Sequence, residues 1–167
     1  PFNEFHLLNP KPIYLTNGIY KKNDLKKILQ KYLSPPYFPI DFIDENNLLR
    51  FINFEEVSDL LKPINFNTMV LNHPGRASGY SLNIGDHKFC YLLDNEFVTS
   101  QENELLKFCS GSHSIIWDGM YTEKEIKIKK GWGHSSIEQG LKFSKKLKLK
   151  NFIISHHSPN RTDKELD

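Results

Sequence analysis

Four side chains that can bind a metal ion follow apolar segments of the sequence. His73, Asp94, Asp118 and His156 each stand at or just after the C-terminal end of an apolar run typical of a β-strand. Polar residues at equivalent strand ends tend to meet at one edge of a sheet, where the sites of α/β proteins are built. Imidazole and carboxylate groups bind zinc, manganese or iron and leave room for an activated water. These positions therefore predict a divalent-metal site.

Each of these residues also has an ordinary structural explanation. His73, before a Pro-Gly pair, could be a turn histidine, and Asp94 could cap the segment that follows it. Asp118 and His134 could form a structural pair at the start of a helix. The pair His156-His157 is harder to explain in this way, because two adjacent imidazoles after a buried strand have no evident role in a core. A single motif match is weak support for a site.

The remaining histidines and the lysine-rich segments fit a solvent-exposed surface. We interpret His6, His87 and His113 as surface or loop residues. The segments 124–130 and 142–150 are rich in lysine and are interpreted as solvated helix and loop faces. None of these residues is assigned to the metal site.

The middle of the sequence predicts the strands that would position the first two candidates. Residues 68–71 form an apolar strand that leads toward the first candidate histidine. Residues 79–84 alternate between apolar and polar, Gly85-Asp86 favours a turn, and 88–93 runs back. This hairpin pattern ends directly before Asp94.

The last third predicts helices and strands in alternation. Ser135 and Glu138 have the spacing of a capping box, so a helix is expected to start there. Strands followed by a strand–helix–strand unit imply a layered α/β domain. The expected elements are a helix over 102–108, a strand over 114–117, a helix to about Lys148 and a strand over 151–154.

The first third is less regular. A short strand is expected over 12–15, then a helix over 25–32 that Asn23-Asp24 can cap and that Ser34-Pro35-Pro36 stops. Residues 38–42 alternate as in a further strand. The apolar residues expected to be buried after it are Phe51, Phe54, Leu60 and Leu61.

Composition sets the class of protein. The chain has 167 residues, 38% of them hydrophobic, which is enough for one core, so we expect a single domain over 1–167. A net charge of +2 with 25% charged residues favours a soluble protein over a coat for nucleic acid. No apolar run approaches the roughly 20 residues that span a bilayer, so no membrane partner is expected. Two cysteines without paired spacing favour a reduced, cytoplasmic location.

Five motifs in order carry a resemblance to a known family. The sequence resembles the metallo-β-lactamase superfamily from about residue 35 to the end, and most of all its branch of phosphodiesterases and tRNA 3′-processing endonucleases. The resemblance implies part of an αββα sandwich, with mixed sheets flanked by helices. The motifs are Asn72-His73-Pro74-Gly75, 91–96, 118–122, 131–136 and 155–159.

The resemblance implies a role for each candidate in the site. His73 would bind one metal ion, His156 a second, and Asp94 would bridge the two. His157 would lie beside them as a residue that supports the ligands or contacts substrate. The cofactor implied is a pair of divalent ions, zinc or manganese, with iron as a further option.

The same resemblance implies the catalytic pair. His134 matches the histidine of a Gly-His-Ser motif that approaches the scissile phosphate, and Asp118 matches the acidic residue that orients it. An imidazole held by a carboxylate stays in one tautomer and can donate a proton to a leaving oxygen. The metal centre would clamp the phosphate and supply hydroxide.

One motif of the superfamily has no counterpart in this sequence. Members carry a His-x-His-x-Asp-His motif that supplies the remaining ligands of both metals. The opening Pro1-Phe2-Asn3 resembles the stretch that follows that motif. The resemblance therefore implies that the chain begins just past it, holds one side of a metal centre and exposes apolar surface.

Three functions follow as hypotheses for the natural protein. The first is a metal-dependent hydrolase, a phosphodiesterase acting on a small-molecule or nucleotide diester. The second is a tRNA 3′-end endonuclease with RNA as substrate, although Arg161 stands one position out of step with the arginine of that branch. The third is a non-catalytic fragment that folds with a partner or as an exchanged homodimer. A cysteine nucleophile is disfavoured, because Cys90 lies in the middle of a strand and no histidine can be paired with it.

Overall fold

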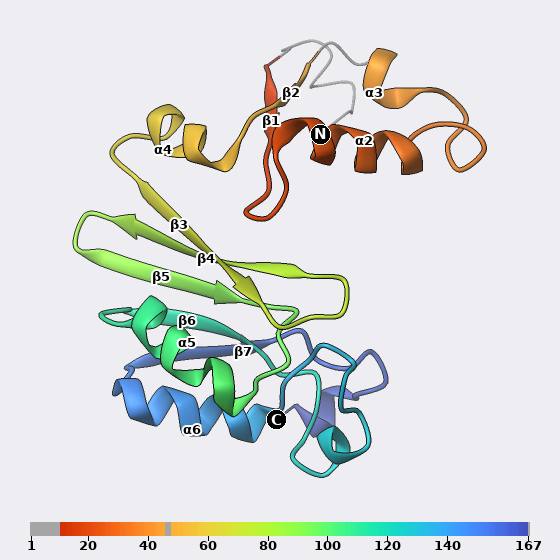
Figure 1. Ribbon diagram of the computed structural model, residues 1–167. Coiled ribbons are helices and arrows are strands. Elements are labelled where there is room, and N and C mark those ends of the chain that lie inside the picture. Colours follow the sequence, from red (N-terminus) through yellow and green to blue (C-terminus); the bar gives the residue numbers. More distant parts are fainter. Residues whose placement is uncertain (1–10, 46–47, 167) are drawn as a thin grey trace. The chain divides into compact units, whose positions relative to one another are not determined.

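The computed structural model describes residues 11–45 and 48–166. Pro1-Phe2-Asn3 and His6 lie outside these ranges, so what we expect of them stays a prediction. The chain divides into two compact units, Pro1–Leu60 and Leu61–Asp167, and each is described by itself (Figure 1). The single domain expected from length stays a prediction as well. Within the described ranges, no helix has the length and apolar character to cross a membrane.

Unit 1 joins two short parallel strands through a helical connection. A parallel pair needs a crossover, which the intervening helices provide. The expected strand over 12–15 and the expected helix after it are both present. The elements are β1 (Ile13–Leu15), α2 (Lys22–Tyr32), α3 (Phe42–Glu45), β2 (Leu49–Phe51), a 3-10 helix (Phe54–Glu56) and α4 (Val57–Leu60).

The cap predicted for the first helix is wrong. Asn23-Asp24 lie inside the first turn of α2, and the N-cap residue is Lys21. The first-turn amide of Lys22 donates instead to Oδ1 of Asn53, at 3.0 Å. A side chain far away in the sequence thus satisfies the helix end, which local spacing does not reveal.

The strand predicted over 38–42 is also wrong. These residues form turns that lead into the first turn of α3. Pro39 has no N–H to give to a ladder, and the Phe42 amide donates back to the carbonyls of Leu33 and Ile40. The alternation brings the rings of Phe38 and Phe42 together instead, at 5.6 Å between centroids.

The buried residues predicted next to this segment are only partly buried or exposed. Leu60 and Leu61 are 48% and 46% exposed, and Phe51 and Phe54 are half-buried. A helix of one turn such as α4 can turn only one side inward, and it buries Val57.

Unit 2 contains a five-stranded mixed sheet in the order β3-β4-β5-β6-β7, counted over its described residues. β3, β4 and β5 are antiparallel neighbours, whereas β5, β6 and β7 run parallel to one another. The predicted hairpin and α/β layering are confirmed. The elements are β3 (Asn65–Leu71), β4 (Ala77–Ile84), β5 (His87–Leu92), a 3-10 helix (Thr99–Gln101), α5 (Glu102–Cys109), β6 (Ser114–Asp118), a 3-10 helix (Glu125–Lys127), α6 (Ile137–Leu147), β7 (Asn151–Ser155) and a 3-10 helix (Asp163–Glu165).

The core lies between the sheet and the helices α5 and α6, which cover the same face (Figure 1). Alternate residues of β5 and β6 point toward the helices, as the period of a strand requires. Trp117 and Phe143 are fully buried and their ring centroids lie 5.1 Å apart. The core cluster consists of Leu71, Cys90, Leu92, Leu105, Cys109, Ile115, Trp117 and Phe143.

The opposite face of the sheet is apolar and exposed. Tyr91 and Ile153 are 42% and 50% exposed, and both lie in one cross-strand row with Ile116. Cross-strand partners point to the same side of a sheet, so the row forms a continuous surface. Its further exposed members are Val70, Ile84 and Phe89.

The capping box of α6 lies one residue later than predicted. The N-cap is Ser136, whose hydroxyl accepts the amide of Gln139 at 3.1 Å, while the side chain of Gln139 accepts the amide of Ser136 at 2.9 Å. The hydroxyl of Ser135 is unavailable, because it donates to the carbonyl of Asn95 and accepts from the amide of Phe97. The helix itself is confirmed and ends at Leu147.

Candidate metal centre

The sheet brings the candidate side chains to one edge. Asp94 follows β5, Asp118 is the last residue of β6, and His156 comes directly after β7. These strands are parallel, so their C-terminal ends meet on the same side. β3 runs in the same direction, because it is related to β5 by two antiparallel pairings, and His73 follows its end.

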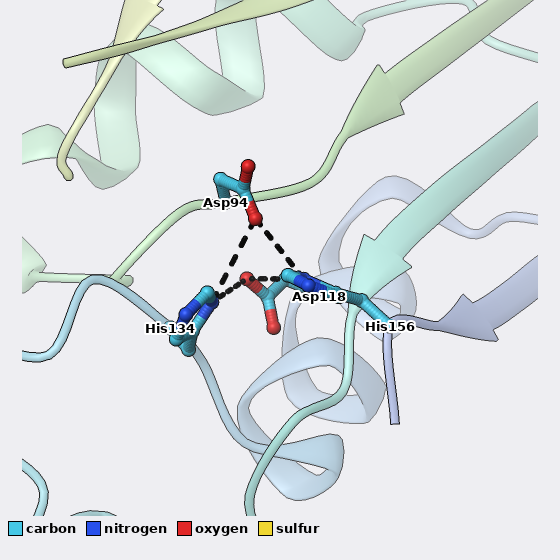
Figure 2. A group of neighbouring side chains, drawn as sticks. All are labelled: Asp94, Asp118, His134 and His156. Carbon is cyan, nitrogen blue, oxygen red and sulfur yellow. Dashed lines mark hydrogen bonds and ion pairs between the residues drawn. The ribbon is translucent and has the colours of Figure 1, made fainter. Parts of the chain in front are cut away.

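Four ligand-type side chains form a compact group at this edge (Figure 2). Asp94, Asp118, His134 and His156 each offer one atom, and these atoms all lie within 4.8 Å of one another. Nδ1 of His156 lies 3.2 Å from Oδ1 of Asp94 and 3.6 Å from Oδ2 of Asp118. The same Asp94 oxygen lies 4.0 Å from Nδ1 of His134. The group thus contains two of the three expected metal ligands and both expected catalytic residues.

The side chains of Asp118 and His134 form a hydrogen bond with each other. Oδ2 of Asp118 lies 2.9 Å from Nδ1 of His134, and Asp118 is completely buried. The amide of Asn95 donates to the same carboxylate oxygen at 3.1 Å, and the amide of Met120 donates to the other at 3.2 Å. The two amides hold the Asp118 carboxylate in place, and the carboxylate in turn orients the His134 ring through Nδ1. Nε2 of His134 is then the ring nitrogen that can exchange a proton with a ligand.

The third expected ligand lies beside this group rather than within it. The ring of His73 meets the ring of His134 edge-on, with centroids 5.6 Å apart. Its Nδ1 accepts the amide of Gly75 at 3.2 Å, so Nε2 is the nitrogen left to bind a metal. A side chain at Gly133 would come within 2.8 Å of that nitrogen. The loop before His134 therefore packs directly on His73 and needs glycine there.

Two residues that we did not assign from sequence hold the loops of the site together. The carboxylate of Glu96 accepts the amides of Gly131 at 2.9 Å and Gly133 at 3.0 Å. The side chain of Asn95 accepts the amide of Asn72 at 3.0 Å. Both Asn95 and Glu96 are buried. Both residues directly follow Asp94 in the motif 91–96, and this position in the sequence could have marked them as part of the site.

The backbone at two of the candidate ligands is left-handed. Asp94 and His156 have φ angles of 57° and 58°. This region costs an ordinary L-residue about 1–2 kcal/mol, although Asp and His adopt it more readily than most. Such strain is concentrated at functional sites, where the surrounding structure holds it in place.

Two residues that follow His156 in the sequence, His157 and Arg161, do not belong to this group of ligand-type side chains. His157 is half-buried, and its Nδ1 has no hydrogen-bond partner among the described residues. Arg161, which departs from the family pattern, donates to Glu125 at 2.8 Å and to the carbonyl of Met120 at 3.4 Å. It therefore ties together the wall of a neighbouring pocket.

That pocket opens beside His134 and has a volume of about 450 Å³. Tyr121 and Glu125 line it, and both have shifted pKa values. Hydrogen bonds from Thr122 and from Arg161 lower the pKa of Glu125 to about 2. Burial raises the pKa of Tyr121, and nearby carboxylates raise it further. The complete lining is Met120, Tyr121, Glu125, Ile128, Lys129, Trp132, His134, Ser158, Pro159 and Asn160.

The residues present fit a divalent metal ion. Nδ1 of His156 is buried and has no hydrogen-bond partner in the part of the chain that the structure describes, although it points into the group. Two carboxylates this close together repel one another unless a cation or proton lies between them. Oxygen and imidazole nitrogen in this arrangement are the ligand set of zinc, manganese or iron.

Comparison with solved structures identifies the fold. The short form of human tRNase Z shares 18% identity over 90% of this chain, with a TM-score of 0.62. The metallo-β-lactamase fold protein YhfI from Bacillus subtilis shares 12% over 96%, with a TM-score of 0.68. A diphosphatase of the PhnP family shares 13% over 96%, with a TM-score of 0.56. The expected metallo-β-lactamase-like fold is thereby confirmed.

The chain spans less than two thirds of the length of each of these proteins. It covers 63% of the human enzyme, 58% of YhfI and 54% of the diphosphatase. No family model matches the sequence, and no curated protein matches it either.

Proposed function

We propose that the natural protein is a metal-dependent hydrolase that cleaves phosphodiesters. The observation that carries this proposal is the hydrogen bond between Asp118 and His134, beside the candidate ligands Asp94 and His156. A metal site alone would serve many hydrolytic reactions. An imidazole fixed by a buried carboxylate next to it adds a proton donor for a leaving oxygen.

The ligands of the metal in this proposal are Asp94 and His156, together with His73, which lies next to them. A divalent ion bound there supplies Lewis acidity to a phosphoryl oxygen and to water. The left-handed backbone at Asp94 and His156 presents their side chains toward each other, at 3.2 Å between Oδ1 and Nδ1. Asp118 is not one of the ligands in this proposal, because its carboxylate already forms hydrogen bonds with two amides and with His134.

His134 moves the proton in this proposal. Asp118 holds Nδ1 of the ring, so proton exchange with substrate takes place at Nε2. The leaving oxygen needs a proton as its bond to phosphorus breaks, and the ring can supply it. Asp118 stabilises the charged ring before the transfer and keeps it oriented afterwards.

The test is turnover of bis-p-nitrophenyl phosphate by the full-length protein supplied with zinc or manganese. We expect release of nitrophenolate that a chelator abolishes and that added metal restores. Absence of turnover with both metals would contradict the proposal.

A second candidate is a tRNA 3′-end endonuclease, which the likeness to human tRNase Z favours. The expected substrate would then be RNA. Cleavage of a precursor tRNA at its 3′ end, compared with the small diester under the same conditions, separates the two candidates. Turnover of the diester without tRNA cleavage would leave only the first.

A further inference from the structure

Apart from His134, the pocket beside it is lined by residues that the proposed reaction does not use. His134 forms part of its wall, so the pocket borders the side chain that donates the proton in the proposed reaction. Its volume of about 450 Å³ lies in the usual range for small-ligand sites, about 300–1,000 Å³. A group attached to the scissile phosphate can therefore enter it.

An exposed indole dominates this wall. Trp132 is 58% exposed, and Nζ of Lys129 lies 3.7 Å from the centroid of its ring. The other tryptophan of the chain, Trp117, is completely buried in the core. Nucleic-acid bases stack on exposed aromatic rings in single-strand binding proteins, and a cation over the other face of the ring adds a cation–π interaction.

The backbone presents this indole from a fixed loop. Trp132 lies between Gly131 and Gly133, which have φ angles of 84° and 87°. The single carboxylate of Glu96 accepts the amides of both glycines. The same loop packs on His73, so the ring is positioned relative to the metal ligands. A preorganised aromatic loses little conformational freedom when a ligand stacks on it.

The charge around the pocket favours an anionic ligand. The segment 123–130 contains lysines at 124, 127, 129 and 130 and glutamates at 123 and 125. Both glutamates are paired, Glu123 with Lys142 at 2.9 Å and Glu125 with Arg161 at 2.8 Å. Of these lysines, Lys129 lines the pocket, whereas Lys127 and Lys130 line a neighbouring one, so Lys129 is the cation that a phosphate in this pocket would meet.

We propose that this pocket is a subsite for a nucleobase attached to the scissile phosphate, which stacks on Trp132 next to Lys129. This inference rests on the proposed phosphodiesterase function and names its substrate class, a single-stranded nucleotide diester rather than a small alkyl diester. Nζ of Lys129 lies over one face of the Trp132 ring, so the base would stack on the opposite face.

The first test is tryptophan fluorescence of the full-length protein, titrated with adenosine 5′-monophosphate in the absence of metal. The exposed Trp132 should be quenched in a saturable way, whereas the buried Trp117 should not respond. The variant Trp132→Leu should lose the quenching, and Lys129→Gln should weaken the affinity severalfold. Absence of saturable quenching in the wild-type protein would overturn the proposal.

The second test compares a dinucleotide with the same compound lacking one base. Wild-type protein should show a KM at least about tenfold lower for the complete dinucleotide, which is the usual scale of stacking on one aromatic side chain. Trp132→Leu should abolish this preference, and Trp132→Phe should keep most of it. An unchanged preference in Trp132→Leu would also overturn the proposal.

Two controls separate the possible failures. Leu141→Ala truncates a similarly exposed apolar side chain on α6 that does not line the pocket, and it should behave as wild type. If neither dinucleotide is cleaved with metal while quenching by the nucleotide persists, the proposed reaction fails and the subsite stands. If both are cleaved equally, the reaction stands and the subsite fails.

Discussion

At the scale of single residues, the site depends on what holds each ligand rather than on the ligands alone. Asp118 is completely buried, yet its carboxylate accepts two amides and the His134 ring. Buried charge is tolerated only when it is bonded in this way. The sequence predicted both residues and their pairing through the family resemblance. The position of Asp118 and His156 at strand ends also predicted that they meet at one edge of the sheet, and their nearest side-chain atoms lie 3.6 Å apart.

The variant Asp118→Asn tests the pairing. It keeps the size of the side chain but removes the charge that stabilises the protonated ring and fixes its tautomer. We expect kcat to fall by about 10²–10⁴-fold, the range for general acid–base catalysis. Turnover of a dinucleotide, whose alkoxide leaving group needs a proton, measures it, with Glu104→Gln on the exposed side of α5 as a control. A change of less than twofold would show that the pair is structural only.

The variant Gly133→Ala tests how His73 is positioned. A Cβ there would lie 2.7 Å from Pro74 and 2.8 Å from Nε2 of His73, so that ring must move. Gly131→Ala is a matched control, because its φ is also left-handed but no described atom lies within 4 Å of the added carbon. We expect the apparent Kd for zinc to rise at least about tenfold in the first variant relative to the second. Equal affinities in the two variants would contradict a role for His73 in metal binding.

At the scale of elements, the strands were predictable and the loops between them were not. The hairpin of β4 and β5, the strands β6 and β7 and the helices α5 and α6 follow from local periodicity. The two errors at helix starts came from long-range hydrogen bonds, whereas the strand predicted over 38–42 fails locally, where the Phe42 amide donates to Leu33 and Ile40. The side chain of Asn53, from another segment, caps α2. The hydroxyl of Ser135 donates to the carbonyl of Asn95 and therefore does not cap α6. Hydrogen bonds of this kind join residues far apart in sequence and leave no periodic signal.

The loop that contains Glu125 has a pH dependence of its own. Thr122 and Arg161 lower the pKa of Glu125 to about 2, below the ordinary value of 4.5. Because the folded pKa is depressed, this stabilisation is present above about pH 4.5 and is lost as the pH falls toward 2. The difference in urea midpoint between wild type and Glu125→Gln should therefore shrink over that range. A difference that stays constant between pH 5 and pH 2 would contradict the assignment.

At the scale of the whole molecule, the exposed face of the sheet in unit 2 is the most unusual feature. Val70, Ile84, Phe89, Tyr91 and Ile153 are all at least 36% exposed there. Contiguous apolar patches of this kind on soluble proteins are normally interaction surfaces. The prediction of exposed apolar surface made from the family pattern agrees with this face.

The isolated chain of 167 residues should therefore associate through this face. Light scattering should show a mass that rises with concentration, and Ile153→Lys should reduce the association because it places a charge in the row, on the outermost described strand β7. Leu141→Lys on α6 adds the same charge to the helical side and should have no such effect. A constant monomer mass at all concentrations would refute this prediction.

The central claim is that Asp94 and His156 belong to a metal centre, and the most direct test is the metal content of the full-length protein. Wild-type protein dialysed against zinc or manganese should retain bound ion, and Asp94→Ala should lose at least part of it, because the carboxylate contributes a ligand on which the group converges. Glu104→Gln should retain as much metal as wild type. Wild-type protein without bound metal, or equal metal in wild type and Asp94→Ala, would contradict the account.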